Sequence, residues 1–121
     1  MSCVQASGAD WLRNGRVAWL WPAAMLTVVV GWVMVPGIRG DILGAAGFAF
    51  AGLLCIGNAV RCRRAHCTAT GPLYLVAAGL FLARAAGADI PAAWIVAGAA
   101  IGTALAFVPE ALGWRYLGRA S

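Results

Sequence analysis

The sequence has very little charge. Only 11% of its 121 residues are Asp, Glu, Lys or Arg, whereas soluble domains average about 25%. Hydrophobic residues make up 63% of the chain, which is more apolar surface than a soluble domain of this size could remove from water. This shortage of charge excludes a soluble enzyme, a disordered tail and a charged nucleic-acid-binding arm. We therefore predict a small integral membrane protein.

The sequence also has no lysine. Its 9 basic residues are all arginines and its acidic residues number 4, which gives a net charge of +5. A basic chain often binds nucleic acid, but these arginines lie at the edges of apolar runs, where they are typical of orientation signals and contacts with anionic lipid. We expect a lipid bilayer, and no nucleic acid, as the partner of this chain.

Several chemical patterns are missing as well. Alternating strands are absent, which disfavours a transmembrane β-barrel. We find no phosphate-binding loop, no serine–histidine–acid set and no metalloprotease helix motif, so hydrolase and nucleotide chemistry are disfavoured. The single histidine excludes bis-histidine haem ligation within one chain, and no acidic residue lies in the middle of an apolar run to serve a proton relay. These absences favour a non-enzymatic protein without a resident cofactor.

What the sequence does contain is four apolar runs, each close to the roughly 20 residues that a membrane helix needs. The first run is too long for a cleaved signal peptide and is predicted to be a signal anchor. Short connections make consecutive helices antiparallel neighbours. The predicted fold is an all-α integral membrane protein, a single domain over 1–121 with four transmembrane helices in an antiparallel bundle. The helices are expected at about 17–36, 41–60, 71–87 and 90–109, with a loop at 61–70.

Polar and small residues mark the expected helix ends and contacts. Asp41 is predicted to cap the second helix, Pro72 to lie in the first turn of the third, and Arg84 to extend from the third helix to the membrane surface. Glycines at four-residue steps permit close contact between helices, either within the chain or with a partner in the membrane. These pairs are Gly40 with Gly44 and Gly98 with Gly102.

The arginines predict the orientation of the chain. With four spans, both termini and the 61–70 loop share one side of the membrane, and most of the arginines lie on that side. The other side has only Arg39 and Arg84. Because positive charge is retained in the cytoplasm, we predict an inner-membrane protein whose termini and central loop are cytoplasmic.

The polar 61–70 stretch contains a group of soft metal ligands. If the second helix continued for about two turns beyond the membrane, Cys55, Cys62 and His66 would share one of its faces, with Cys67 one residue further round. Thiolate and imidazole groups bind soft ions such as Cu(I), Zn(II) and Hg(II), and the neighbouring arginines favour the thiolate form. The predicted metal ligands are therefore Cys55, Cys62, His66 and Cys67. A closed four-ligand site could also draw on a second subunit, in a homo-oligomer.

The segment from Asn58 to Pro72 resembles a pattern found in small, poorly characterised prokaryotic membrane proteins. The pattern is N-A-x-R-C-x-R-x-H-C-x-x-x-G-P between two apolar helices. A looser similarity is to the mercuric-ion transport proteins of bacteria, which are small helical membrane proteins with cysteines in a membrane helix and in a cytoplasmic segment. Their hallmark is a cysteine pair in the first helix, and the run from Val17 to Pro36 contains no cysteine.

Three functions compete on these grounds. The first is binding or transport of a soft metal ion by the cytoplasmic-side cysteines and His66. The second is a non-catalytic accessory role in a membrane complex, with the glycine faces packed against partners. The third is a membrane thiol oxidoreductase in which Cys62 and Cys67 form a disulfide, although the predicted cytoplasmic side keeps thiols reduced.

Overall fold

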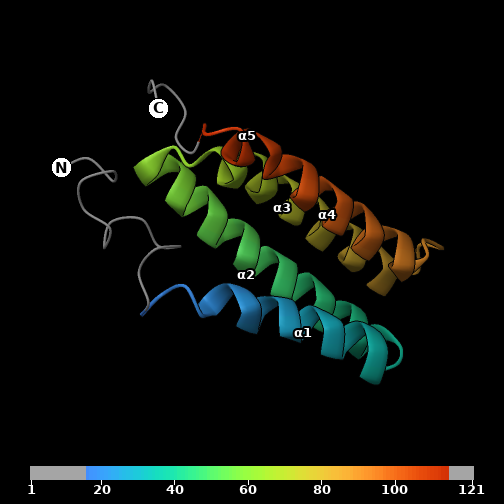
Figure 1. The fold of residues 1–121 in the computed structure, drawn as a ribbon. Helices are drawn as coiled ribbons and strands as arrows, with labels where there is room; N and C mark the ends of the chain where they lie inside the picture. Colours follow the sequence, from blue (N-terminus) through green and yellow to red (C-terminus); the bar gives the residue numbers. More distant parts are fainter. Residues whose placement is uncertain (1–15, 115–121) are drawn as a thin grey trace.

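Every regular element that the structure describes is a helix. The computed structural model describes residues 16–114 (Figure 1). No strand occurs among these residues, which confirms the all-α prediction. The connection between the second and third helices and the short last helix lie at one end of the molecule, and the other two connections lie at the opposite end. The helices are α1 (Leu20–Met34), α2 (Ile38–Cys62), α3 (Ala65–Ala85), α4 (Ala92–Ala106) and α5 (Val108–Ala111).

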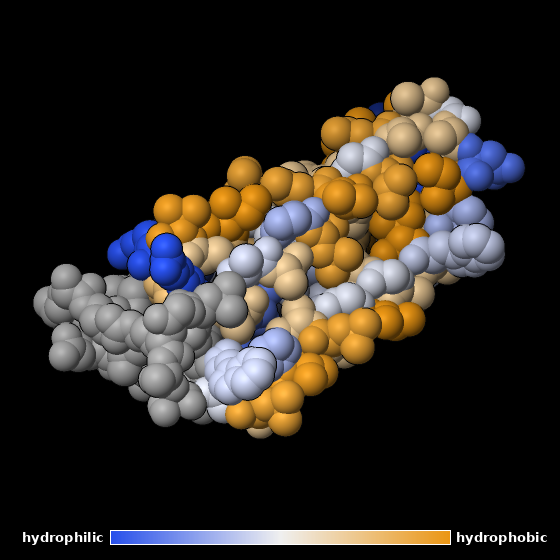
Figure 2. All heavy atoms as spheres, turned by 90° about the horizontal axis from the view of Figure 1, so that it is seen from above, coloured by the Kyte–Doolittle hydropathy of each residue, from blue (hydrophilic) through white to orange (hydrophobic). Residues whose placement is uncertain are grey.

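Three helical segments are long and apolar enough to cross a membrane, namely Ile38–Cys62, Ala65–Ala85 and Ala92–Ala111. Helix α1 is equally apolar but has 15 residues, or about 22 Å at 1.5 Å per residue, which is shorter than a hydrocarbon core of roughly 30 Å. In Figure 2 apolar residues cover most of the visible flank, and the strongly hydrophilic residues gather mainly at the ends. Large apolar side chains face outward along the flank, among them Val60, Trp94 and Met34.

Helix α1 is shorter than the predicted 17–36 segment because of its flanking residues. Residue 35 precedes a proline, whose ring disfavours helical backbone at the position before it, and Val35 is extended with φ −116° and ψ 104°. The chain then reverses at Gly37, whose φ of 78° suits a residue without a Cβ atom. Helix α2 begins at the next residue.

The prediction of a loop at 61–70 is wrong, because only two residues separate α2 from α3. Arg63 adopts a left-handed conformation with φ 52°, and its backbone N–H donates to the carbonyl of Ala59 at 2.7 Å, which closes α2. Helix α3 starts immediately afterwards at Ala65. Sequence reasoning treated the polar composition of this stretch as a loop signal.

The threonines of that stretch lie within α3 and satisfy their own hydroxyls there. The hydroxyl of Thr68 donates to the carbonyl of Arg64 at 3.1 Å, and that of Thr70 donates to the carbonyl of His66 at 2.9 Å. Such bonds to the preceding turn let threonine occupy a helix interior. Pro72 therefore lies inside α3 instead of in its first turn.

The Gly40 and Gly44 pair packs within the chain. A Cβ atom at Gly40 would overlap the carbonyl oxygens of Gly31 and Val35 at the α1 side, and one at Gly44 would lie 2.9 Å from the ring of Phe81 in α3. In the pair of Gly98 and Gly102, only one glycine packs against another helix. Gly102 faces Leu73 in α3, whereas nothing lies within 4 Å of the Cβ position of Gly98. Small residues thus bring α1 and α3 close to α2.

At the end opposite the α2–α3 connection, Arg84 does not extend freely to the membrane surface. Its Nε donates to Oδ1 of Asp41 at 2.9 Å, and its guanidinium also donates to the carbonyl of Ile90. Asp41 lies in the first turn of α2, but the N-cap residue is Gly37 and no side chain caps the helix. The predictions that Asp41 caps the helix and that Arg84 extends to the surface are therefore replaced by an ion pair that joins α2, α3 and the α3–α4 connection.

Candidate functional site

The buried polar side chains that the structure describes gather at the end of the bundle where α2 meets α3. Asn58, His66 and Thr70 are at most 2% exposed, and two free thiols, Cys55 and Cys67, are 1% and 0% exposed. Burying a polar group is costly unless it finds a hydrogen-bond partner. No buried side-chain nitrogen or oxygen in the described part of the chain lacks one. These groups therefore form one satisfied polar network in an apolar bundle.

Cys55 lies in α2 and receives a hydrogen bond from α1. The indole N–H of Trp21 donates to Sγ of Cys55, with a nitrogen–sulfur distance of 3.0 Å. The thiol of Cys55 also interacts with the thiol of Cys67 and the hydroxyl of Thr70, both from α3. The packing of α2 against α3 thus places the two free cysteines of the described chain in one buried cluster.

Cys67 lies in the first turn of α3 between an amide and an imidazole. The side-chain amide of Asn58 donates to Sγ of Cys67 across 3.6 Å. On its other side, Nε2 of His66 lies 3.4 Å from the same sulfur. Cys67 therefore has a potential proton acceptor beside it and a second thiol, Cys55, within reach.

The ring nitrogen of His66 that faces away from Cys67 is bound by a carboxylate. Its Nδ1 lies 2.6 Å from Oε1 of Glu110 in α5, and its backbone N–H donates to the same oxygen at 3.4 Å. A carboxylate only accepts hydrogen bonds, so Nδ1 carries a hydrogen, and in the neutral imidazole the Nε2 lone pair faces Cys67. The ring of Phe107 stacks on the imidazole at 4.1 Å and fixes its plane.

Arg64 completes this network. Its Nε and Nη2 donate to the two carboxylate oxygens of Glu110 at 3.2 and 3.3 Å, and both side chains are mostly buried. Two parallel hydrogen bonds fix the orientation of the carboxylate. The network thus runs from Arg64 through Glu110 and His66 to Cys67, and then to Cys55.

Of the four predicted metal ligands, the structure brings Cys55, His66 and Cys67 together. The route differs from the one expected, because α2 ends at Cys62 and His66 returns on α3. Cys62 is disulfide-bonded, so it is not a free thiol in this network. Within residues 16–114, no group of three or more His, Cys, Asp or Glu side chains is arranged to hold a metal ion.

Sequence reasoning missed two members of this network. They are Glu110, which is the only acidic residue after the fourth apolar run, and Trp21, which lies near the start of the first run. An isolated carboxylate at the end of an apolar run is the feature that could have identified Glu110.

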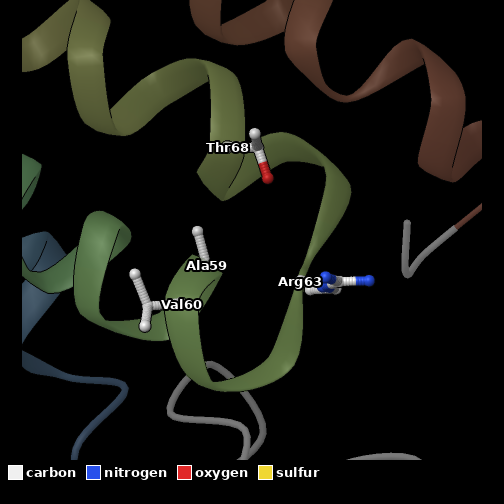
Figure 3. A pocket seen from close by; sticks show the side chains of 4 residues that line it. All are labelled: Ala59, Val60, Arg63 and Thr68. Carbon is white, nitrogen blue, oxygen red and sulfur yellow. The ribbon is translucent and has the colours of Figure 1, made fainter. Parts of the chain in front are cut away.

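Two hollows lie near the network. One, of about 350 Å³, is bordered by Ala59, Val60, Arg63 and Thr68 beside the α2–α3 connection (Figure 3). The other is a groove of about 390 Å³ to which α1, α2, α3 and α4 all contribute residues, including Met25, Phe48, Tyr74 and Thr103.

Comparison of the chain with protein-family models, with curated proteins and with solved structures found no match.

Proposed function

We propose that this protein is an integral membrane thiol oxidoreductase in which Cys55 and Cys67 cycle between two free thiols and a disulfide. The observation that carries the proposal is a pair of free thiols in one buried cluster, one of which lies beside a histidine oriented by a carboxylate. A nucleophile, a base and a group that orients the base are the parts that activate a cysteine. In this proposal the four helices form an antiparallel bundle in the inner membrane, with the arginine-rich end and both termini in the cytoplasm.

The chemistry follows from the network. Nε2 of His66 takes the proton of Cys67, and Glu110 stabilises the imidazolium that results. Oxidation then breaks two S–H bonds and forms one S–S bond between Cys67 and Cys55. The two electrons and two protons pass to a quinone, which becomes a hydroquinone. A substrate dithiol returns the pair to its reduced form by thiol–disulfide exchange and becomes a disulfide itself.

The predicted cytoplasmic location does not oppose this proposal once burial is considered. Exchange with soluble thiols depends on access to the sulfur as well as on the redox potential of the compartment. Cys55 and Cys67 are almost fully buried, so glutathione has no direct contact with them. Partners that approach through the bundle determine their redox state.

Binding of a soft metal ion, such as Hg, Cu or Zn, is the second candidate. It is favoured by the Glu110–His66 hydrogen bond, because histidines that ligate metals usually donate their other ring N–H to a carboxylate or carbonyl. Cys55 and Cys67 would be the thiolate ligands, and His66 would join them only after a rearrangement, because no three such side chains in residues 16–114 are already arranged around one ion. Cys62 does not belong to this set, since it is disulfide-bonded.

The test uses protein purified anaerobically in mild detergent. We expect a small apolar thiol oxidant, which enters detergent micelles, to link Cys55 to Cys67, as a disulfide-bonded peptide pair in mass spectrometry. We expect Cys55→Ser and Cys67→Ser each to abolish that product. Cys62→Ser is the matched control and should leave it unchanged. Failure of Cys55 and Cys67 to pair would refute the redox proposal.

Measuring the metal content of the purified protein distinguishes soft-metal binding from the redox function. One Cu or Zn ion per chain that survives Cys62→Ser and is lost in Cys67→Ser would support metal binding. Absence of both the disulfide and the ion would leave the accessory role as the surviving hypothesis.

A further inference from the structure

The groove of about 390 Å³ has a composition suited to one class of ligand. Its lining residues come from α1, α2, α3 and α4 and are apolar except for the hydroxyls of Tyr74 and Thr103. Buried Phe48 and Tyr74 lie on its inner side, with ring centroids 5.6 Å apart. Small-molecule sites are typically 300–1,000 Å³, mostly apolar, with a few polar groups that orient the ligand.

The groove and the thiol network lie on the same faces of the helices. In each helix, a residue that lines the groove lies seven positions from a residue of the thiol network. In α2 these are Phe48 and Cys55, and in α3 they are Tyr74 and Cys67. Seven residues are about 10 Å along a helix and return to nearly the same face. The remaining pairs are Trp21 with Val28 in α1, and Thr103 with Glu110 across α4 and α5.

The side chain of Tyr74 reduces the distance between the groove and the thiol network. Side chains of a helix lean toward its N-terminus, which in α3 is the direction of Cys67. Tyr74, Cys55 and Cys67 belong to the same buried cluster of side chains. The polar end of the groove therefore faces the Cys55–Cys67 pair.

The Tyr74 and Thr103 hydroxyls form a hydrogen-bonded pair in which only the Tyr74 hydrogen can be redirected to a ligand. Their oxygens are 2.8 Å apart, and Thr103 donates to the carbonyl of Ala99 at 2.7 Å. Tyr74 therefore donates to Thr103 and is able to turn its hydrogen toward a ligand carbonyl instead. No charged side chain lines the groove, so a phosphate or carboxylate headgroup would be buried there without a counter-charge.

We propose that this groove binds a membrane quinone, with a ring carbonyl accepting a hydrogen bond from Tyr74 and the apolar tail lying along α1 and α4. The quinone is the acceptor for the Cys55–Cys67 pair, so this inference rests on the proposed function. The dithiol loses two electrons and two protons and becomes a disulfide, while the quinone gains both and becomes a hydroquinone. Phe48 and the ring of Tyr74 offer flat apolar surfaces to the planar quinone.

Binding is tested first in a chain that cannot react. In the Cys55→Ser, Cys67→Ser double variant, a short-chain benzoquinone should quench tryptophan fluorescence saturably. Adding Tyr74→Phe should weaken that binding about five-fold, the effect of losing one hydrogen bond. Thr103→Val removes the acceptor that competes for the Tyr74 hydrogen and should not weaken the binding. Thr27→Val is the matched control, because the Thr27 hydroxyl donates to the carbonyl of Ala23 in the same way and lies outside the groove.

Turnover is tested next with the cysteines intact. Anaerobic reduction of the quinone, followed by its ultraviolet absorbance, should yield one hydroquinone per Cys55–Cys67 disulfide. Ala100→Phe, which fills the groove, should slow the reaction at least ten-fold, whereas the neighbouring Ala97→Phe, which is exposed and does not line the groove, should not.

The outcomes separate the two proposals. If a small apolar oxidant links Cys55 to Cys67 but quinone binding is indifferent to Tyr74→Phe and Ala100→Phe, the quinone inference is overturned and the dithiol proposal stands. Hydroxyl-dependent quinone binding without any Cys55–Cys67 disulfide would support the groove as a site and overturn its redox role.

Discussion

Nδ1 of His66 and Oε1 of Glu110 lie 2.6 Å apart although 44 positions separate the two residues in the chain. The contact exists because only two residues separate the end of α2 from the start of α3, which places His66 at the same end of the bundle as α5. It leaves Nε2 of His66 directed at the sulfur of Cys67. The closure of four apolar helices thus determines which ring nitrogen is free to take a proton.

Replacing Glu110 by glutamine should slow the reaction of Cys67 with an uncharged maleimide about ten-fold. Glutamine retains a hydrogen-bond acceptor but removes the negative charge that stabilises the imidazolium, and supporting residues of this kind typically contribute 10–100-fold. The rate is measured by mass spectrometry of the alkylated peptides in detergent.

Two controls accompany the Glu110→Gln experiment. Asp89→Asn removes an exposed carboxylate at the opposite end of the bundle and should leave the rate unchanged. The alkylation rate of Cys55 reports on folding, because a loosened bundle would speed the reaction of both thiols. Equal Cys67 rates in Glu110→Gln and the unaltered protein would exclude His66 as the base that Glu110 orients.

Arg84→Gln should destabilise the fold by about 1–3 kcal/mol, the usual cost of leaving a partly buried polar partner unpaired. The change removes the ion pair with Asp41 and the hydrogen bond to the carbonyl of Ile90, and the two charged side chains are 27% and 13% exposed. Thermal unfolding followed by circular dichroism in detergent measures the effect. Arg39→Gln, an exposed arginine near the same end, is the control, and an equal loss in both variants would contradict the structural role of the pair.

The all-helical fold could be predicted from the apolar runs, because a run of that length and hydropathy favours a helix whatever its specific contacts. Helix ends were harder to predict. The 61–70 stretch has the polar composition of a loop, yet its threonines satisfy their hydroxyls within α3. The left-handed conformation of Arg63 closes α2 in a single residue, and no glycine or proline marked that position.

The site could be predicted only in part, for a related reason. Cys55, His66 and Cys67 were singled out by residue type and by their spacing on one continuous helix, whereas α2 ends at Cys62 and the other two residues lie on α3. Their contacts with Trp21 and Glu110 depend on how α1 and α5 pack against α2 and α3. Spacing along one helix carries no information about such contacts between helices.

The orientation of the chain is tested by reporters fused after Ser121. The predicted cytoplasmic terminus should give a fluorescent green-fluorescent-protein fusion and an inactive alkaline-phosphatase fusion, because the phosphatase needs an oxidising compartment to form its disulfides. Replacing Arg61, Arg63 and Arg64 together by glutamine should weaken this preference, since arginines near helix ends set the topology. An active phosphatase on the unaltered chain would place the thiol end outside the cytoplasm.

Gly47→Ala should destabilise the bundle, whereas Gly98→Ala should not. A Cβ atom at Gly47 would lie 2.6 Å from Cγ2 of Val28 and 2.7 Å from the carbonyl oxygen of Ala24, so α1 would have to move away from α2. At Gly98 nothing lies within 4 Å, and alanine is the better helix former by up to about 1 kcal/mol. Thermal unfolding of the two variants should therefore shift in opposite directions. Because α1 also carries Trp21 to Cys55, Gly47→Ala should speed alkylation of Cys55 as well, and unchanged Cys55 reactivity in that variant would show that the α1–α2 contact does not shield the thiol.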